Sequence, residues 1–165
     1  MKSISVGLIG FGTIGTGVIK LLRQNADLLD RRVGAHLDLK KVADIDVKTP
    51  RSVDVPASLL TTDASEILDD PEIDIAIELV GGYEPARTFI LRALERKKHV
   101  VTANKALLAV HGSEIFRAAE RQARNIGFEA SVGGTIPIIK VLKESLAANR
   151  ICSIFGIING TANFI

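Results

Sequence analysis

A glycine-rich segment near the amino terminus has the residue types and the spacing to bind phosphate. It reads Gly10-Phe11-Gly12-Thr13-Ile14-Gly15 and stands between an apolar run and a helical pattern of apolar residues. In such a loop the first glycine makes a tight turn, the second lets a pyrophosphate approach, and the third lets the helix pack closely. Unpaired N–H groups at the helix start then face the anion. The same spacing occurs in plain glycine-rich turns, but the strand-to-helix context favours dinucleotide binding.

An acid, Asp44, follows the predicted strand 37–43 and is expected at the tip of that second strand. A carboxylate there can accept hydrogen bonds from the adenosine ribose of a dinucleotide. Asp44 lies further from Gly15 than the roughly 20 residues usual for this role, so a solvated loop acid is the alternative interpretation. Lys48 and Arg51 follow closely and could hold a 2′-phosphate, so the sequence leaves NAD and NADP both open.

A lysine, Lys105, follows the apolar segment 99–103, which we expect to be a strand. The carboxyl ends of parallel strands are where doubly wound folds bind ligands. Lys105 is then either a solvated loop lysine or a cation beside the nicotinamide and the reacting carbon, where an ammonium can polarise a carbonyl oxygen and exchange a proton with it. Gly81, after the most apolar stretch of the chain, would flank the same cofactor.

These residues fall where predicted strands give way to loops or helices. The apolar patterns predict strands at 4–9, 37–43, 59–62, 73–80, 99–103 and 128–131. Between them, helices are predicted from the glycine loop to about Leu29, briefly after Asp63, from Pro85 to about Lys98, and at 113–125. This alternation predicts an α/β fold of the Rossmann type, a doubly wound parallel sheet with helices on both faces.

The composition fits a single dinucleotide-binding domain at 1–149, with 150–165 as the beginning of a second domain, in which 151–158 is expected to be a strand and is followed by a polar loop. The 165 residues are 47% apolar and 24% charged, with 21 basic and 19 acidic side chains. This balance gives no reason to expect nucleic acid or a membrane as a partner, and the apolar amino-terminal run is too short to span a membrane. Cys152 is the single cysteine, which indicates a reducing compartment and no zinc site. The last residues look like a sequence cut at the start of another domain.

Five ordered segments together resemble the amino-terminal region of the homoserine dehydrogenase family. They are GFGTIGTGV at 10–18, ELVGG at 78–82, VTANKALLA at 101–109, EASVGGTIPII at 129–139 and INGTANFI at 158–165. The resemblance implies an oxidoreductase that interconverts L-homoserine and L-aspartate 4-semialdehyde with NAD or NADP, on the route to threonine, methionine and isoleucine. It also implies a cytoplasmic homodimer, in which this chain supplies the cofactor half and most of the substrate domain lies beyond Ile165.

The resemblance also assigns individual residues. It places Phe11, Gly12, Thr13 and Ile14 in the pyrophosphate loop, and Thr102 and Lys105 near the nicotinamide and substrate. It further implies a sodium site made mostly of backbone carbonyls, with Glu129, Val132, Gly134 and Ile136 as the matching positions. The alternative interpretation of this last segment is a helix-entry turn with a structural Glu129, in which Thr135 is the candidate N-cap.

Two other functions stay open at this point. A related Rossmann reductase could act on another semialdehyde or on an imine, although the NGT-x-N ending and the Asn104-Lys105 pair argue against it. A non-catalytic dinucleotide-sensing module would need the glycine loop but not Lys105. Replacing Lys105 therefore discriminates between a sensor and an enzyme.

Overall fold

A parallel sheet organises the part of the chain that the computed structural model describes, residues 2–134 and 136–156. Its strands are β1 (Lys2–Ile9), β2 (Ala35–Ala43), β3 (Leu60–Thr61), β4 (Ile75–Glu78), β5 (His99–Thr102) and β6 (Ile126–Gly127). They lie in the order β3-β2-β1-β4-β5-β6, and each neighbouring pair is parallel. The order reverses at β1, as in Rossmann folds, so loops that leave β1 and β4 diverge there and open a crevice.

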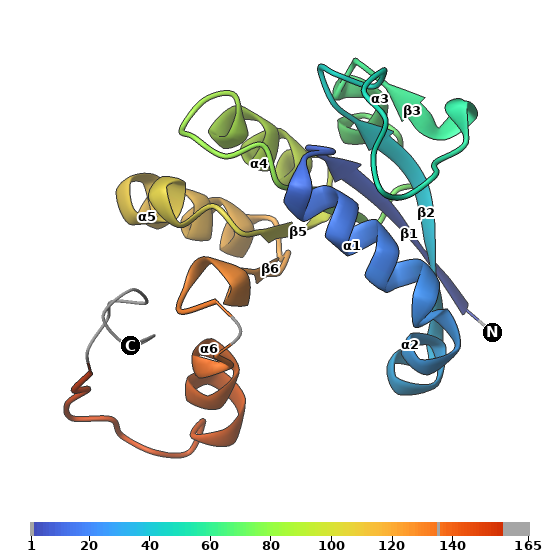
Figure 1. Ribbon diagram of the computed structural model, residues 1–165. Helices are drawn as coiled ribbons and strands as arrows, with labels where there is room; N and C mark the ends of the chain where they lie inside the picture. The colour runs from blue at the N-terminus through green and yellow to red at the C-terminus, as the bar shows by residue number, and fades with distance from the viewer. Residues whose placement is uncertain (1, 135, 157–165) are drawn as a thin grey trace, which may run out of the picture.

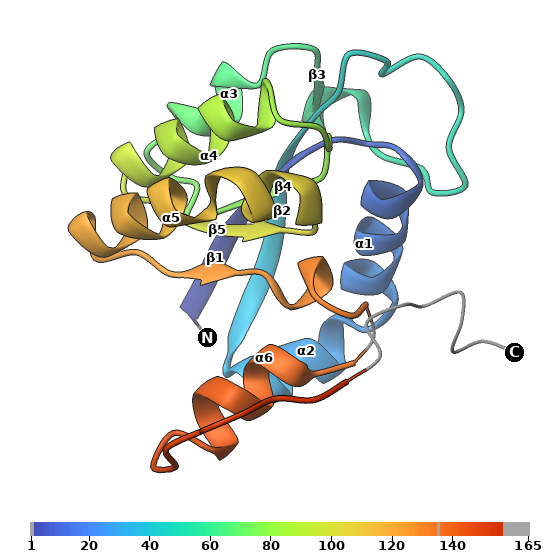
Figure 2. The same ribbon diagram turned by 90° about the vertical axis from the view of Figure 1, so that its left-hand side faces the viewer.

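Helices cover both faces of this sheet (Figures 1 and 2). They are α1 (Thr13–Gln24), α2 (Ala26–Val33), α3 (Ser65–Leu68), α4 (Ala86–Glu95) and α5 (Lys105–Arg121). The short α6 (Ile138–Lys140) stands apart from the sheet, beside the turn Glu129–Ser131. Figure 2 shows α1 on one face and α3, α4 and α5 on the other. The predicted doubly wound α/β fold is confirmed. In the described residues, no helix is long and apolar enough to cross a membrane.

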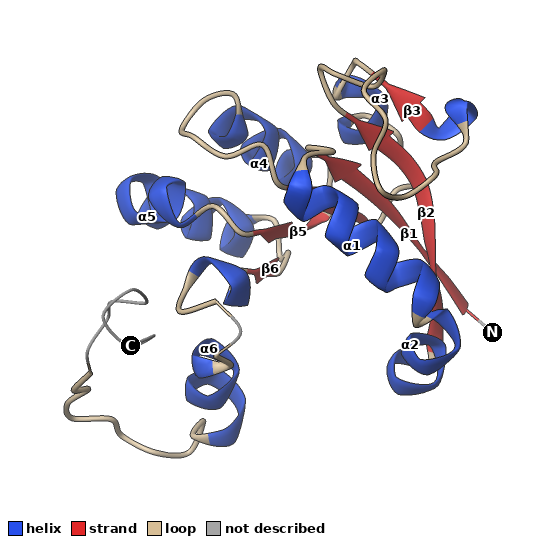
Figure 3. Cartoon of the chain, in the orientation of Figure 1, coloured by secondary structure: helices blue, strands red, loops and turns tan. Residues whose placement is uncertain are grey.

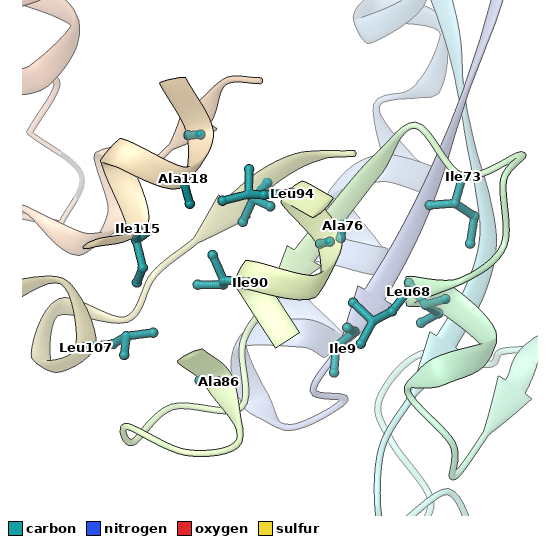
Figure 4. Close-up of a cluster of buried hydrophobic side chains, with 14 of the residues drawn as sticks. Ile9, Leu68, Ile73, Ala76, Ala86, Ile90, Leu94, Leu107, Ile115 and Ala118 are labelled. Carbon is teal, nitrogen blue, oxygen red and sulfur yellow. The ribbon is translucent and has the colours of Figure 1, made fainter. Parts of the chain in front are cut away.

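Two apolar clusters fix the sheet between its helices. One joins the sheet to α3, α4 and α5 through side chains such as Ile9, Ile90, Leu94 and Ile115 (Figure 4). The other joins it to α1, where Ile19 packs with Val6, Leu8 and Val42. Because burial of each such side chain contributes about 1.5–3 kcal/mol, this core holds the strand ends in place. The loops that follow β1 and β2 then gather at one edge of the sheet (Figure 3).

The first predicted helix is interrupted, which corrects the expectation of one helix up to Leu29. Asn25 separates α1 from α2 with φ −113° and ψ 21°, and both its N–H and its side-chain amide donate to the carbonyl of Leu21. Asparagine competes in this way with regular helical hydrogen bonding. Gly34 then ends α2 in the left-handed region at φ 72°, and β2 begins directly after it, two residues earlier than predicted.

The predicted helix at 113–125 is misplaced, because α5 already begins at Lys105 and ends at Arg121. The side chain of Asn104 accepts the N–H of Leu107 and so provides the N-cap, while Gly112 is tolerated in the interior of the helix. The predicted start at residue 113 was wrong because the Asn104 cap sets the beginning of the helix, which the apolar pattern alone does not show.

The strand predicted at 128–131 is also wrong. The strand is β6, two residues earlier, and Glu129–Ser131 forms a 3-10 turn in which the N–H of Ser131 donates to the carbonyl of Phe128. Of the strand predicted at 151–158, residues 151–156 are not in a strand. Residues 157–165 and the proposed N-cap Thr135 lie outside the described residues.

Candidate functional site

Gly10 makes the tight turn between β1 and α1 that the sequence predicted. Its φ is 107°, and a Cβ atom at this position would lie 2.6 Å from the carbonyl carbon of Leu79. Its N–H donates to the carbonyl of Ala43 at 2.8 Å, which ties the turn to the end of β2. A side chain here would combine an unfavourable φ with a backbone clash, so only glycine fits.

Gly15 and Gly12 differ in what surrounds them. A Cβ on Gly15 would lie 2.0 Å from the carbonyl oxygen of Gly10, so α1 packs directly on the turn as predicted. At Gly12, the N-cap of α1, no atom lies within 4 Å of the corresponding position. The open side of the loop is therefore at Gly12, next to N–H groups of the helix start that have no partner in the described part of the chain. Such groups can stabilise an anion.

A cleft of about 630 Å³ opens beside this loop, within the range of small-molecule sites. It brings together four of the residues predicted to bind a cofactor, which are Gly10, Gly12, Asp44 and Gly81. Its other walls come from the segment Thr62–Ser65 and from the start of α4 at Pro85. The cleft thus lies at the carboxyl edge where β1, β2 and β4 end.

Asp44 is held at the rim of this cleft and is not a freely solvated loop acid. Its Oδ2 accepts the N–H of Phe11 at 2.5 Å, and its Oδ1 accepts the N–H of Asp46 at 2.8 Å. Each carboxylate oxygen has a further lone pair that a ribose hydroxyl can use. The bond to the glycine loop was not expected, because sequence spacing alone carries no sign of it.

Lys48 and Arg51 lie beside a second hollow of about 510 Å³, which Phe11 also lines. The guanidinium of Arg51 stands 5.7 Å from the centre of the Phe11 ring and donates to the backbone oxygen of Asp46 at 3.0 Å. Hydrogen bonds from Thr49, through its side chain and its backbone, are the main reason that the pKa of Asp46 falls to about 2. The hydrogen bond to the backbone oxygen of Asp46 therefore orients the Arg51 side chain. Lys48 is exposed to solvent.

The end of β5 holds Thr102, Asn104 and Lys105 at the same edge of the sheet. Thr102 is fully buried, and its hydroxyl donates to the Glu78 carboxylate at 2.7 Å. Lys105 is the exposed first residue of α5, placed as predicted for a cation at the carboxyl edge. Glu78 was missed by sequence reasoning, although an acid towards the end of the most apolar predicted strand, flanked by Ile77 and Leu79, is a signal that could have found it.

The segment predicted to bind a cation contains a carboxylate that is already engaged. The two oxygens of Glu129 accept the N–H groups of Ile139 and Lys140, each at 2.9 Å. This geometry favours the alternative interpretation of Glu129 as a residue that holds the entry to α6. Val132, Gly134 and Ile136 are exposed at this turn. Among the described residues, no three His, Cys, Asp or Glu side chains gather as metal ligands.

Comparison with known protein families gives two matches along this chain. Residues 10–129 match the family model described as "Homoserine dehydrogenase, NAD binding domain". Residues 137–165 match the model described as "Homoserine dehydrogenase". The first match contains the glycine loop, Asp44, Gly81 and Lys105.

Individual relatives and solved structures agree with these matches. The chain is 47% identical to the homoserine dehydrogenases of Bacillus subtilis and Pseudomonas aeruginosa, and it covers 38% of the length of each. A crystal structure of a homoserine dehydrogenase from Thiobacillus denitrificans is 48% identical, with a TM-score of 0.91 over 99% of this chain and 38% of its own. The chain therefore spans about two fifths of these relatives. From these matches and its Rossmann fold, this chain belongs to the homoserine dehydrogenase family.

Proposed function

We propose that this chain is the dinucleotide-binding part of an oxidoreductase that interconverts L-homoserine and L-aspartate 4-semialdehyde by hydride transfer. The observation that carries this proposal is the cleft at the carboxyl edge, which combines an open Gly12, the rim carboxylate of Asp44 and Gly81. The family match to an NAD-binding domain supports a dinucleotide as its occupant.

The residues present fit such a cofactor in three places. The N–H groups from Gly12 to Ile14 would hold the pyrophosphate, since a Cβ at Gly12 would meet no protein atom and the space is free for a ligand. Asp44 would accept hydrogen bonds from the adenosine ribose. Gly81 and Lys105 would border the nicotinamide half, and the nicotinamide itself supplies or accepts the hydride when bound. Thr102, which is fully buried, would act on this half only through its hydrogen bonds.

Lys105 is the group that we assign to the proton and charge at the substrate oxygen. A cation at the carboxyl edge of β5 can donate a hydrogen bond to an aldehyde oxygen and stabilise an alkoxide as charge develops on it. The neutral alcohol offers that cation less charge, so its effect is concentrated in the transition state. Binding of homoserine itself is assigned to a part of the relatives that this chain does not cover.

The choice of cofactor and the further partners follow from the same proposal. Asp44 favours NAD, because a carboxylate accepts from both ribose hydroxyls but repels a 2′-phosphate, while Arg51 and Lys48 act in the opposite sense. We also propose a sodium ion held by backbone carbonyls at Glu129, Val132, Gly134 and Ile136, since hard cations bind such oxygens. The carboxylate of Glu129 would take no part, because it bonds the N–H groups of Ile139 and Lys140. A cytoplasmic homodimer, and domains that meet near residues 149 and 150, complete the proposal.

Calorimetric titration of this chain with NADH and NADPH tests the cofactor assignment. Gly12→Val places a branched side chain where the pyrophosphate would approach, so affinity should fall by about tenfold or more while the fold persists. Gly17→Val is the matched control, because Gly17 also has open space around it but lies one turn further along α1. Equal affinity in both variants would mean that the phosphates bind elsewhere.

A further inference from the structure

A buried carboxylate joins the two loops that border the nicotinamide half of the site. Glu78 is the last residue of β4 and is only 2% exposed. Its Oε1 accepts the N–H groups of Val80 at 2.9 Å and Gly81 at 3.2 Å, and its Oε2 accepts the Thr102 hydroxyl at 2.7 Å. A carboxylate is costly to bury unless its oxygens are bonded, and here both are.

The hydrogen bonds continue from Thr102 back to the loop where they began. The Thr102 hydroxyl oxygen accepts the N–H of Asn104 at 3.0 Å, and the Asn104 amide donates to the carbonyl of Gly82 at 2.7 Å. Ser131 donates to the carbonyl of Thr102 at 2.9 Å, which adds the turn after β6. The result is a closed ring of hydrogen bonds between the β4–α4 loop and the β5–α5 junction.

We propose that Glu78 is a positioning residue for the nicotinamide half of the dinucleotide site. This inference rests on the proposed function and extends it to a residue that does not itself line the cleft. Gly81 is a wall of the cleft, and Lys105 directly follows Asn104, so the ring sets the distance between the two. The two oxygens of the Glu78 carboxylate accept three donors from these two segments at once.

Glutamine at this position keeps the size but cannot keep the pattern. If its oxygen faces Val80 and Gly81, its NH₂ group faces Thr102, whose hydroxyl proton then loses its acceptor in a fully buried place. If the glutamine oxygen faces Thr102, its NH₂ group instead meets the backbone N–H groups of Val80 and Gly81, which are also donors. In both orientations, at least one hydrogen bond between the β4–α4 loop and the β5–α5 junction is lost.

The test compares NADH with ADP as ligands of this 165-residue chain. ADP carries the adenosine and both phosphates but leaves the end of β5 empty. Glu78→Gln should weaken NADH binding about tenfold while ADP affinity changes by less than about twofold. A residue needed only for stability would lower the melting temperature and leave both affinities of the folded protein unchanged. Glu114→Gln is the matched control, because Glu114 bonds Arg87 on the outer side of α4 and α5.

Thr102 provides a second, independent pair of variants in case Glu78→Gln does not fold. Thr102→Ser keeps the hydroxyl and should keep the NADH affinity, whereas Thr102→Val should show the loss. In the double variant with Glu78→Gln, the loss should be close to that of either single change, since all break one network. Unchanged NADH affinity in Glu78→Gln or Thr102→Val, or an equal loss for ADP and NADH, would overturn the assignment of Glu78. If the unmodified chain binds neither NADH nor NADPH, the proposed function itself fails.

Discussion

The carboxylate of Asp44 accepts the backbone N–H of Phe11 at 2.5 Å, although the two residues stand 33 positions apart in the sequence. The bond joins the end of β2 to the loop that follows β1, the two segments on either side of the place proposed for the adenosine ribose. Asp44 thus has two roles in one position, since it orients the glycine loop and presents a charge to the ligand.

The charge of Asp44 should determine the preference between the two cofactors. We expect the chain to bind NADH more tightly than NADPH, and Asp44→Asn to reduce this difference, because asparagine no longer repels a 2′-phosphate. Its single oxygen can still accept from Phe11, although the bond from the N–H of Asp46 is then lost. Calorimetric dissociation constants of both cofactors provide the measurement. Asp38→Asn, at an exposed acid in the middle of β2, is the control. Tighter binding of NADPH by the unmodified chain would reverse the role given to Asp44 and favour Arg51 and Lys48.

The 165-residue chain should bind dinucleotide but turn over homoserine at a negligible rate. The reason is that the chain spans about two fifths of the length of its relatives, and the part proposed here to bind the cofactor is the cleft beside the glycine loop. Absorbance at 340 nm, which follows NADH formation, and calorimetry on the same sample measure the two properties. Robust homoserine-dependent formation of NADH by this chain would contradict the proposal that it binds the cofactor but not the substrate.

Lys105→Ala should lower kcat far more than it weakens cofactor binding in a full-length homoserine dehydrogenase that contains this chain. General acid and base groups contribute roughly 10²–10⁴-fold, so a loss of that order is expected with nearly normal NADH affinity. Steady-state kinetics together with a binding titration give both values, and Lys2→Ala, at the opposite edge of the sheet, is the control. A steep rise of KM for NAD with little change in kcat would make Lys105 a cofactor-binding cation. An unaffected nucleotide-linked function would favour a sensing module.

Asp46 should stabilise the fold at neutral pH and lose this effect in acid. Its pKa is lowered to about 2, chiefly by hydrogen bonds from Thr49, from an ordinary value of 3.8. A group whose pKa is depressed by folding stabilises the protein above its unfolded pKa, and the contribution disappears as pH falls from about 4 to about 2. Asp46→Ala should therefore lower the melting temperature at pH 7 and do so less at pH 3. Asp38→Ala is the control, and a difference that stays constant over this range would contradict the prediction.

The sequence predicted the architecture because its strongest signals are local. The apolar strands and the glycine loop gave the sheet, the crossing to α1 and the edge at which ligands bind. Gly10 and Gly15 have the predicted roles since their constraint comes from the backbone of the same turn. The predicted ends of helices were wrong where the hydrogen bond of one side chain determines them. Examples are Asn25 between α1 and α2, and Asn104 at the start of α5.

The remaining parts of the site depend on contacts between segments that are distant in the sequence. The bonds of Asp44 to Phe11 and of Glu78 to Thr102 exist because strands 33 and 24 positions apart become neighbours. No spacing rule reports such pairs. For the same reason, the sequence offered a structural Glu129 only as an alternative to a cation site, and could not specify that this side chain bonds the N–H groups of Ile139 and Lys140.

The central place of β1 has a consequence for synthesis on the ribosome. This first strand is hydrogen-bonded on one side to β2 and on the other to β4, so one of its edges has no partner until Ile75–Glu78 has been made. At a synthesis rate of roughly 5–20 residues per second, that interval lasts several seconds. During it, Val6, Leu8 and Ile9 lack the contacts that β4 later makes with β1. The nascent chain therefore passes through a period in which an apolar strand edge is open to chaperones or to neighbouring chains.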